Sequence, residues 1–323
     1  MNKYSRTYNI DKTLYPNIFS VLKALPDEYF LGNSHAPSLR HPGGILNRAT
    51  DEIIESFLSV LQKLDDLRTI TEPKEKQENV KVLLRDMGGL FGHFDSFQDE
   101  SYIILKSLSP VPPQDNAVGE KTVYEWLRKN GYTCASDFFG RTGNIQQLID
   151  CFTNRLKHAN QKLDYVTASV QGIHIPGFFI DELKGEEVDK IYQPVPPAQF
   201  KSTVAISFHA MLKLLLICFY ELNDALEKAL RKHIKVIHGV DFSKREIVKH
   251  NDKFLTVVDA VADMPEHFYP FEYRKFPRIN RDGKTYQFSY PHKARIPYVG
   301  QLKVASTHTA DGFTKTFNLP FFG

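Results

Sequence analysis

One long apolar stretch in the second half of the chain constrains the fold more than any other feature. Residues 204–222 read VAISFHAMLKLLLICFYEL, and a helical pattern extends from residue 202 to about residue 238. His209 and Lys213 interrupt the stretch, so its uninterrupted apolar run is far shorter than the roughly 20 residues that a membrane span requires. A helix that is apolar on nearly all sides is buried. We therefore expect residues 202–238 to form the central helix of a bundle.

Most of the chain before this stretch has helical periodicity. Apolar residues recur at steps of three and four within residues 44–67, which predicts a long amphipathic helix. A second helix, from about residue 79, is expected to loosen or break at Gly88, Gly89 and Gly92, because glycine disfavours helix interiors. Residues 71–77 are interpreted as a solvated turn. Further helices are predicted at residues 95–108, 121–130 and 143–161.

Two parts of the chain change to strand periodicity. Residues 163–169 and 173–180 flank a Gln-Gly pair, which predicts a hairpin. Near the C-terminus, two Asp-Gly pairs each separate alternating segments and predict further hairpins. The expected fold class is α+β, mainly α: a helical bundle with an inserted β-hairpin and a small C-terminal antiparallel sheet. The predicted parts are an irregular segment (1–42), the bundle (43–240, hairpin at 163–182) and a β-rich, basic and aromatic region (241–323).

Composition excludes several classes of protein. The formal net charge of +3 argues neither for nor against nucleic acid as a partner. Three cysteines without paired short spacing argue against a disulfide framework or a zinc site, and the start of the chain lacks a signal-length apolar run. We therefore expect a cytoplasmic protein with no membrane partner. The absence of phosphate-loop, dinucleotide, HExxH, GxSxG and CxxC motifs leaves no metal or cofactor to expect.

The most specific candidate site is the segment NRLKHAN, residues 154–160, in a predicted helix. Arg155 and His158 are three residues apart and share a helical face. An imidazole can move a proton near neutral pH, and a guanidinium can hold a phosphate and offset developing charge. Asp99 or Glu100, on an earlier helix, could orient the imidazole. The cluster therefore predicts phosphodiester cleavage, with a structural or helix-capping role as the alternative.

This arrangement resembles the HEPN-type helical proteins of prokaryotic defence and toxin systems. The resemblance covers about residues 80–238 and implies a helical bundle that cleaves RNA without metal, using an Arg–polar–His motif that faces a carboxylate. The family has more residues between its Arg and His than the two that separate Arg155 from His158. Two pairs with the family spacing are interpreted as cations near helix ends: Arg231 with His238, and Arg245 with His250.

A second nuclease hypothesis starts from the predicted hairpin. Asp164 lies on its first strand, and Glu182 and Lys184 follow its second strand on one face. Metal-dependent nucleases of the PD-(D/E)xK type are similar, because an Asp and a Glu bind Mg²⁺ while a Lys positions water. However, no Pro precedes Asp164, and an exposed strand end explains the same residues.

The clearest charge signal lies in residues 228–303, where 16 Lys and Arg face 8 Asp and Glu, a net charge of +8. Many of these cations alternate with aromatic residues. Cations neutralise phosphates and rings stack on bases, as in single-strand binding. Alternatively, the aromatics fill one face of a small sheet while the cations guard its edge. The candidate nucleic-acid-binding residues are Arg274, Arg278, Arg281, Lys284, Tyr286 and Tyr290.

These observations give one leading hypothesis and one rival. The leading hypothesis is a nucleic-acid-directed protein, a metal-independent HEPN-like endoribonuclease in prokaryotic antiviral defence or growth control, acting on RNA or another single strand. The rival is a non-catalytic module that binds a partner protein. Convergence of Arg155, His158 and a carboxylate on an open cleft would favour the enzyme.

Overall fold

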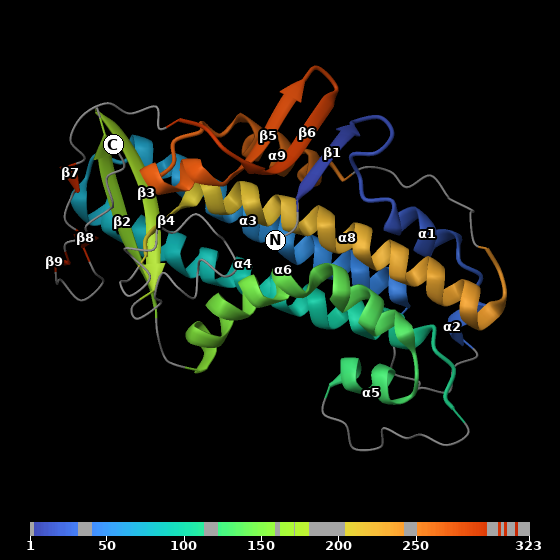
Figure 1. Ribbon diagram of the computed structural model, residues 1–323. Helices are drawn as coiled ribbons and strands as arrows, with labels where there is room; N and C mark the ends of the chain where they lie inside the picture. The colour runs from blue at the N-terminus through green and yellow to red at the C-terminus, as the bar shows by residue number, and fades with distance from the viewer. Residues whose placement is uncertain are drawn as a thin grey trace.

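The structure is a computed structural model in which residues 3–31, 41–112, 122–158, 162–170, 172–180, 204–241, 251–295, 303–304, 307–308 and 314–315 are described. The fold class is α+β and mainly helical, as predicted. Long helices lie side by side, one small sheet covers an end of the bundle and another lies along its flank (Figure 1).

Helix α8 (Phe208–His238) is the central helix, as its apolar stretch predicted. Every residue from Phe208 to Tyr220 is buried. The helix begins later than predicted because Ser207 caps it, its hydroxyl accepting a hydrogen bond from the backbone N–H of Ala210 at 3.3 Å. Among the residues that the structure describes, no helix is long and apolar enough to cross a membrane.

Helices α3 (Pro42–Thr69) and α4 (Pro73–Ser107) form a long antiparallel pair beside α8. The segment predicted as a solvated turn instead contains the start of α4, where the Glu72 carboxylate accepts a hydrogen bond from the backbone N–H of Lys74 at 2.8 Å. This cap and the proline in the first turn both favour a helix start. The charged residues of this segment therefore begin a helix.

The break predicted at the α4 glycines is wrong. Helix α4 continues through Gly88, Gly89 and Gly92 without interruption. Each glycine costs a helix about 1 kcal/mol relative to alanine. Leu90 and Phe94, both fully buried on the same helix, contribute more than this through packing. Tertiary burial therefore outweighs local propensity.

The remaining helices surround this core. The helix predicted at 143–161 begins earlier, as α6, and packs between α4 and α8. Part of the C-terminal region predicted to be β-rich is helix α9, which the apolar residues Phe254, Val257, Val258 and Val261 anchor in the core. The bounds of these helices are α1 (Ile18–Ala24), α2 (Glu28–Leu31), α5 (Val123–Lys129), α6 (Thr133–His158), α9 (Asp252–Asp263) and the 3₁₀ helix η2 (Pro270–Arg274).

Two of the three predicted hairpins are confirmed, and the turn of the third, at Asp311-Gly312, lies outside the described residues. Strands β2 (Leu163–Val170) and β3 (Ile173–Ile180) turn at Gly172, with φ of +80°, and β5 (Phe276–Asp282) and β6 (Thr285–His292) turn at Gly283, with φ of +55°. Glycine adopts such φ values without steric cost. The first hairpin belongs to a sheet of order β4-β3-β2-β7. The short outer strands of this sheet are β4 (Ile206–Ser207) and β7 (Lys303–Val304). A separate two-stranded sheet pairs β8 (Thr307–His308) with β9 (Thr314–Lys315).

The N-terminal segment, predicted to be irregular, contributes a strand to the C-terminal sheet. Strand β1 (Tyr4–Asn9) pairs antiparallel with β6, giving the order β1-β6-β5. Its tyrosines face the core, and the ring centroids of Tyr8 and Phe288 are 5.3 Å apart. Tyr220 of α8 contacts Phe288 with centroids 4.7 Å apart. The sheet and the bundle therefore share one hydrophobic core.

Candidate functional site

Two of the predicted catalytic residues, Arg155 and His158, lie on the last turns of α6, and α6 packs against α4. The rings of Phe91 on α4 and Phe152 on α6 stack with centroids 4.4 Å apart and an interplanar angle of 6°. Nearby, a Cβ at Gly88 would lie 3.7 Å from Leu156 Cδ1, so the glycine allows this side chain to approach the α4 backbone closely. Gly88 and Phe91 of α4 therefore face the last two turns of α6.

Asp99 and Glu100 are adjacent in sequence but face different helices. The Glu100 carboxylate is ion-paired with Arg48 on α3. Asp99 instead lies near Asp95 and near Lys157, on the last turn of α6. Of the two predicted carboxylates, Asp99 is therefore the one that α4 presents toward the α6 terminus.

Three carboxylates share the lysine at this position. Lys157 Nζ lies 2.5 Å from Asp95 Oδ2. Burial raises the pKa of Asp99, and the charge of Asp95 raises it further while Lys157 lowers it. Burial and the charges of Asp95 and Asp99 raise the pKa of Asp150 in the same way, again against Lys157. One lysine cannot neutralise three neighbouring carboxylates, so Asp99 and Asp150 hold protons more readily than free aspartates do.

The cationic half of the predicted site is only partly described. Arg155 is half-buried on α6, and His158 is the last residue of that helix, its side chain outside the described residues. Convergence of Arg155, His158 and Asp99 therefore stays a prediction. Within the described ranges, no group of three or more His, Cys, Asp or Glu side chains is arranged to hold a metal ion.

The metal-dependent nuclease hypothesis also stays a prediction. Asp164 is half-buried on β2, opposite Phe179 of β3. Glu182 and Lys184 lie outside the described residues. No geometry therefore joins the three residues.

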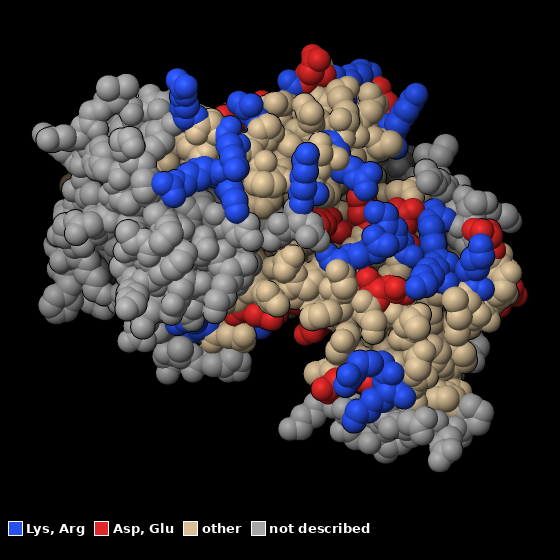
Figure 2. Space-filling model, in the orientation of Figure 1, with Lys and Arg blue, Asp and Glu red and all other residues tan. Residues whose placement is uncertain are grey.

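Three of the four cations predicted to bind nucleic acid are paired with carboxylates. The guanidinium of Arg278 donates two hydrogen bonds to Glu266, at 2.7 and 3.1 Å. Arg281 pairs with Asp259 at 2.9 Å, and Lys284 Nζ pairs with Asp11 at 2.9 Å. Arg274 is exposed at the end of η2. On the visible face, cations are scattered over the β5–β6 hairpin and mixed with acids along α8 (Figure 2).

The tyrosines predicted to stack on bases are core residues. Tyr286 is 0% exposed and Tyr290 is 2% exposed. The Tyr286 hydroxyl donates a hydrogen bond to Asp259, and the Arg281 guanidinium lies 5.6 Å from its ring centroid. Stacking needs an accessible ring face. The hairpin in this structure matches the alternative interpretation, in which rings fill one face and cations guard the edge.

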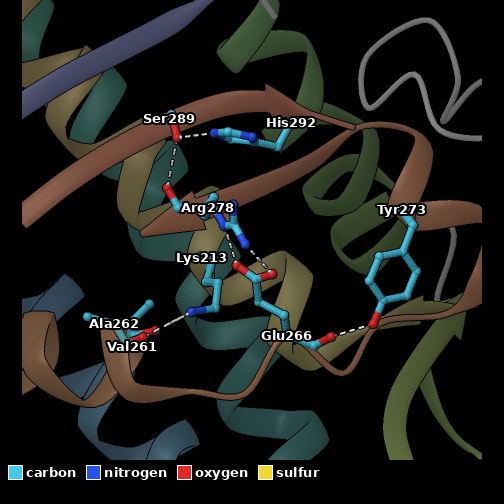
Figure 3. Close-up of polar contacts among 8 residues, drawn as sticks. All are labelled: Lys213, Val261, Ala262, Glu266, Tyr273, Arg278, Ser289 and His292. Atoms are coloured by element: carbon cyan, nitrogen blue, oxygen red, sulfur yellow. Dashed lines mark hydrogen bonds and ion pairs between the residues drawn. The ribbon is translucent and has the colours of Figure 1, made fainter. Parts of the chain in front are cut away.

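A polar cluster that the sequence did not predict lies between α8, the end of α9 and the β5–β6 hairpin (Figure 3). Lys213 is 1% exposed, and its Nζ donates hydrogen bonds to the carbonyl oxygens of Val261 at 2.9 Å and Ala262 at 3.3 Å. These carbonyls belong to the last turn of α9, which lacks partners within its own helix. Burial lowers the pKa of Lys213 to about 8, against the opposing charge of Glu266. The lysine therefore caps α9 and complements its helix dipole.

The other members of the cluster fasten the hairpin to this cap. Glu266 accepts the two bonds from Arg278, and its backbone carbonyl accepts a hydrogen bond from the Tyr273 hydroxyl. His292 Nε2 lies 2.7 Å from Ser289 Oγ, which donates a hydrogen bond to the Arg278 carbonyl at 3.5 Å (Figure 3). Burial and the charge of Arg278 lower the pKa of His292. A lone lysine within an apolar helix was the only sequence signal for this network.

No family model, curated protein or solved structure matches this chain. The function is therefore inferred from the residues of the chain itself.

Proposed function

We propose that this chain is a metal-independent endoribonuclease of the HEPN-like kind, used in prokaryotic defence or growth control. Its reaction centre is the end of α6, with Arg155 and His158 as phosphate-holding and proton-moving groups. The observation that supports the proposal is the raised pKa of Asp99, which lies one turn after Asp95 on α4, where Asp95 pairs with Lys157 of α6. A raised pKa makes a carboxyl group hold its proton more tightly than a free aspartate does, which favours general-acid catalysis.

The proposed reaction needs a base, an acid and a phosphate clamp. His158 accepts the proton of a ribose 2′-hydroxyl as the 2′-oxygen forms a bond to the adjacent phosphorus. The bond from phosphorus to the 5′-oxygen breaks, and Asp99 donates its proton to that oxygen. Arg155 offsets the charge that develops on the phosphoryl oxygens. The products are a 2′,3′-cyclic phosphate and a free 5′-hydroxyl, so atoms and charge balance.

Cleavage of a single-stranded RNA in the presence of EDTA tests the proposal. His158→Ala and Asp99→Asn should each slow cleavage by about 10²- to 10⁴-fold, the range for positioned acid–base groups. The matched controls are His174→Ala on β3 and Asp282→Asn on β5, both exposed and remote in sequence from α6, and neither should change the rate.

Two results would contradict this assignment. Cleavage by Asp99→Asn and His158→Ala at the control rates would remove both residues from the reaction. Loss of wild-type cleavage in EDTA would transfer the activity to Asp164, Glu182 and Lys184, since Mg²⁺ chemistry needs the metal. In both cases the melting temperature must stay near the wild-type value for the comparison to be valid.

The second candidate function is a non-catalytic module that binds a partner protein. The ion-paired cations and buried rings of the β5–β6 hairpin favour it, because they give this region a structural role. Purified protein that neither cleaves nor retains RNA at low salt, where phosphate contacts are strongest, would support the module over the enzyme.

A further inference from the structure

Two imidazole rings lie close together at the start of α8, within the electrostatic influence of an arginine at the end of α3. Arg68 lies on the last turn of α3, His209 on the first turn of α8, and His267 in the segment between α9 and η2. The two imidazole rings have centroids 6.4 Å apart. His209 is 3% exposed, His267 is half-buried, and the Arg68 side chain is 59% exposed. The group therefore extends from the core to the surface.

The buried member of this group has an unsatisfied nitrogen. The backbone of His267 forms a hydrogen bond with the His209 ring. His209 Nδ1 is buried without a hydrogen-bond partner among the described residues. Leaving a buried polar atom unpaired costs about 1–3 kcal/mol, so folded proteins retain few of them. The orphan nitrogen indicates a position where a polar ligand atom belongs.

The charges around the two imidazoles are predominantly positive. Burial lowers the pKa of His209 to about 3, and Arg68, His267 and Lys213 lower it further. Burial and Arg68 also lower the pKa of His267. No carboxylate is among the main groups that shift either imidazole in the described structure. Burial is the larger cause for both rings, and an anion placed here would offset the part that the positive charges add.

Nearby carboxylates are engaged elsewhere. Asp65 pairs with Arg68 at 3.1 Å, but both side chains are mostly exposed, and such surface pairs contribute little free energy. Glu272 accepts hydrogen bonds from the Ser207 backbone N–H at 3.1 Å and hydroxyl at 2.6 Å, so it already compensates the positive end of α8. Arg68 is therefore the cation that can exchange its partner for a ligand.

We infer that Arg68, His209 and His267 form a binding site for a phosphoryl group. A guanidinium offers paired donors that match two phosphoryl oxygens, and an imidazole that gains a proton adds a charge-assisted hydrogen bond. The ligand is either the backbone phosphate of a nucleic acid or a free phosphate, and both present the same oxygens. This inference does not rest on the proposed ribonuclease reaction, which uses other residues.

Titration of the full-length protein with inorganic phosphate, followed by calorimetry and by the NMR signals of the histidine rings, tests the site. Phosphate should raise the pKa of His267, and Arg68→Ala should weaken phosphate binding at least about tenfold, as expected for a lost charge-assisted bond. His267→Asn should weaken it similarly. The control is Arg85→Ala, which removes another exposed arginine paired with a nearby aspartate on its own helix and should leave binding unchanged.

A competing single-stranded RNA distinguishes the two ligand sources. Displacement of phosphate by RNA, with both affinities reduced in Arg68→Ala, identifies a backbone phosphate site. Phosphate binding that RNA does not displace identifies a site for free phosphate. Equal phosphate affinities in Arg68→Ala and Arg85→Ala, or no response of His267 to millimolar phosphate, would overturn the inference. Because His158→Ala leaves this site intact, loss of RNA cleavage in that variant tests only the proposed function.

Discussion

Replacing Gly177 on β3 with alanine should destabilise the protein through a collision that the local backbone cannot avoid. A Cβ at Gly177 would lie 2.8 Å from Tyr269 Cζ, and closer still to the Tyr269 hydroxyl and the Ile206 carbonyl oxygen. Tyr269 is fully buried, its hydroxyl donating long hydrogen bonds to the carbonyls of Val166 at 3.4 Å and Ile175 at 3.5 Å. The ring is enclosed in the core, and the Ile206 carbonyl belongs to a strand that pairs with β3.

The expected cost follows from this geometry. Adding a methylene group to a packed core costs about 1–3 kcal/mol when neighbours can shift. Here one of the neighbours is the backbone carbonyl of Ile206, which precedes Ser207, the strand partner of Gly177. We therefore expect Gly177→Ala to lower the free energy of unfolding by about 3 kcal/mol or more. Urea denaturation of Gly177→Ala and wild type, compared at equal m-values, measures the difference.

Gly89→Ala is the matched control. A Cβ at Gly89, within α4, would meet nothing within 4 Å. Alanine in a helix interior is favoured over glycine by about 1 kcal/mol, so this variant should be equally stable or more stable. A Gly177→Ala protein within about 0.5 kcal/mol of wild type, below the usual cost of overpacking, would refute the close approach of Tyr269 to β3.

Two further predictions concern the central helix α8. Leu215 is fully buried, so Leu215→Ala should lower the free energy of unfolding by about 2–5 kcal/mol. A loss under about 1 kcal/mol in urea denaturation would place α8 at the periphery. Burial lowers the pKa of Lys213 from 10.5 to about 8, so between these pH values the unfolded chain holds this proton more tightly than the folded protein does. The free energy of unfolding should therefore rise with pH across that window, by up to roughly 3 kcal/mol, and Lys213→Met should abolish the rise in denaturation series at stepped pH.

Local sequence signals predicted the elements whose stability is decided locally. The Asp282-Gly283 turn was predicted because glycine tolerates the positive φ that the turn requires, and its φ is +55°. The glycines of α4 gave a wrong prediction of a helix break, because helix propensity is a weak preference that a buried apolar face outweighs. The pairing of β1 with β6 joins Tyr4 to Tyr290, and no local pattern can specify a partner so distant in sequence.

The candidate site was harder to predict because it depends on how helices are rotated against one another. Asp99 and Glu100 were equivalent in the sequence, yet packing turns one toward α6 and the other toward Arg48 on α3. Alternation in β6 likewise identifies one face for Tyr286 and Tyr290 without saying whether that face is covered. Helix α8 covers that face and β1 pairs with β6 at its edge, so the rings became core residues.

The charge of a sequence segment is a poor guide to where a folded protein attracts anions. Residues 228–303 carry a net charge of +8, yet Lys284 pairs with Asp11, a carboxylate from the opposite end of the chain. Conversely, Arg68 and His209 come from segments that are not distinguished by their own charge, and only His267 lies within the basic segment. Coulomb interactions depend on distances in the folded state, and screening limits them to about 10 Å at ordinary salt. A phosphoryl ligand should therefore be sought first where α3 meets α8, and only then on the more basic C-terminal hairpin.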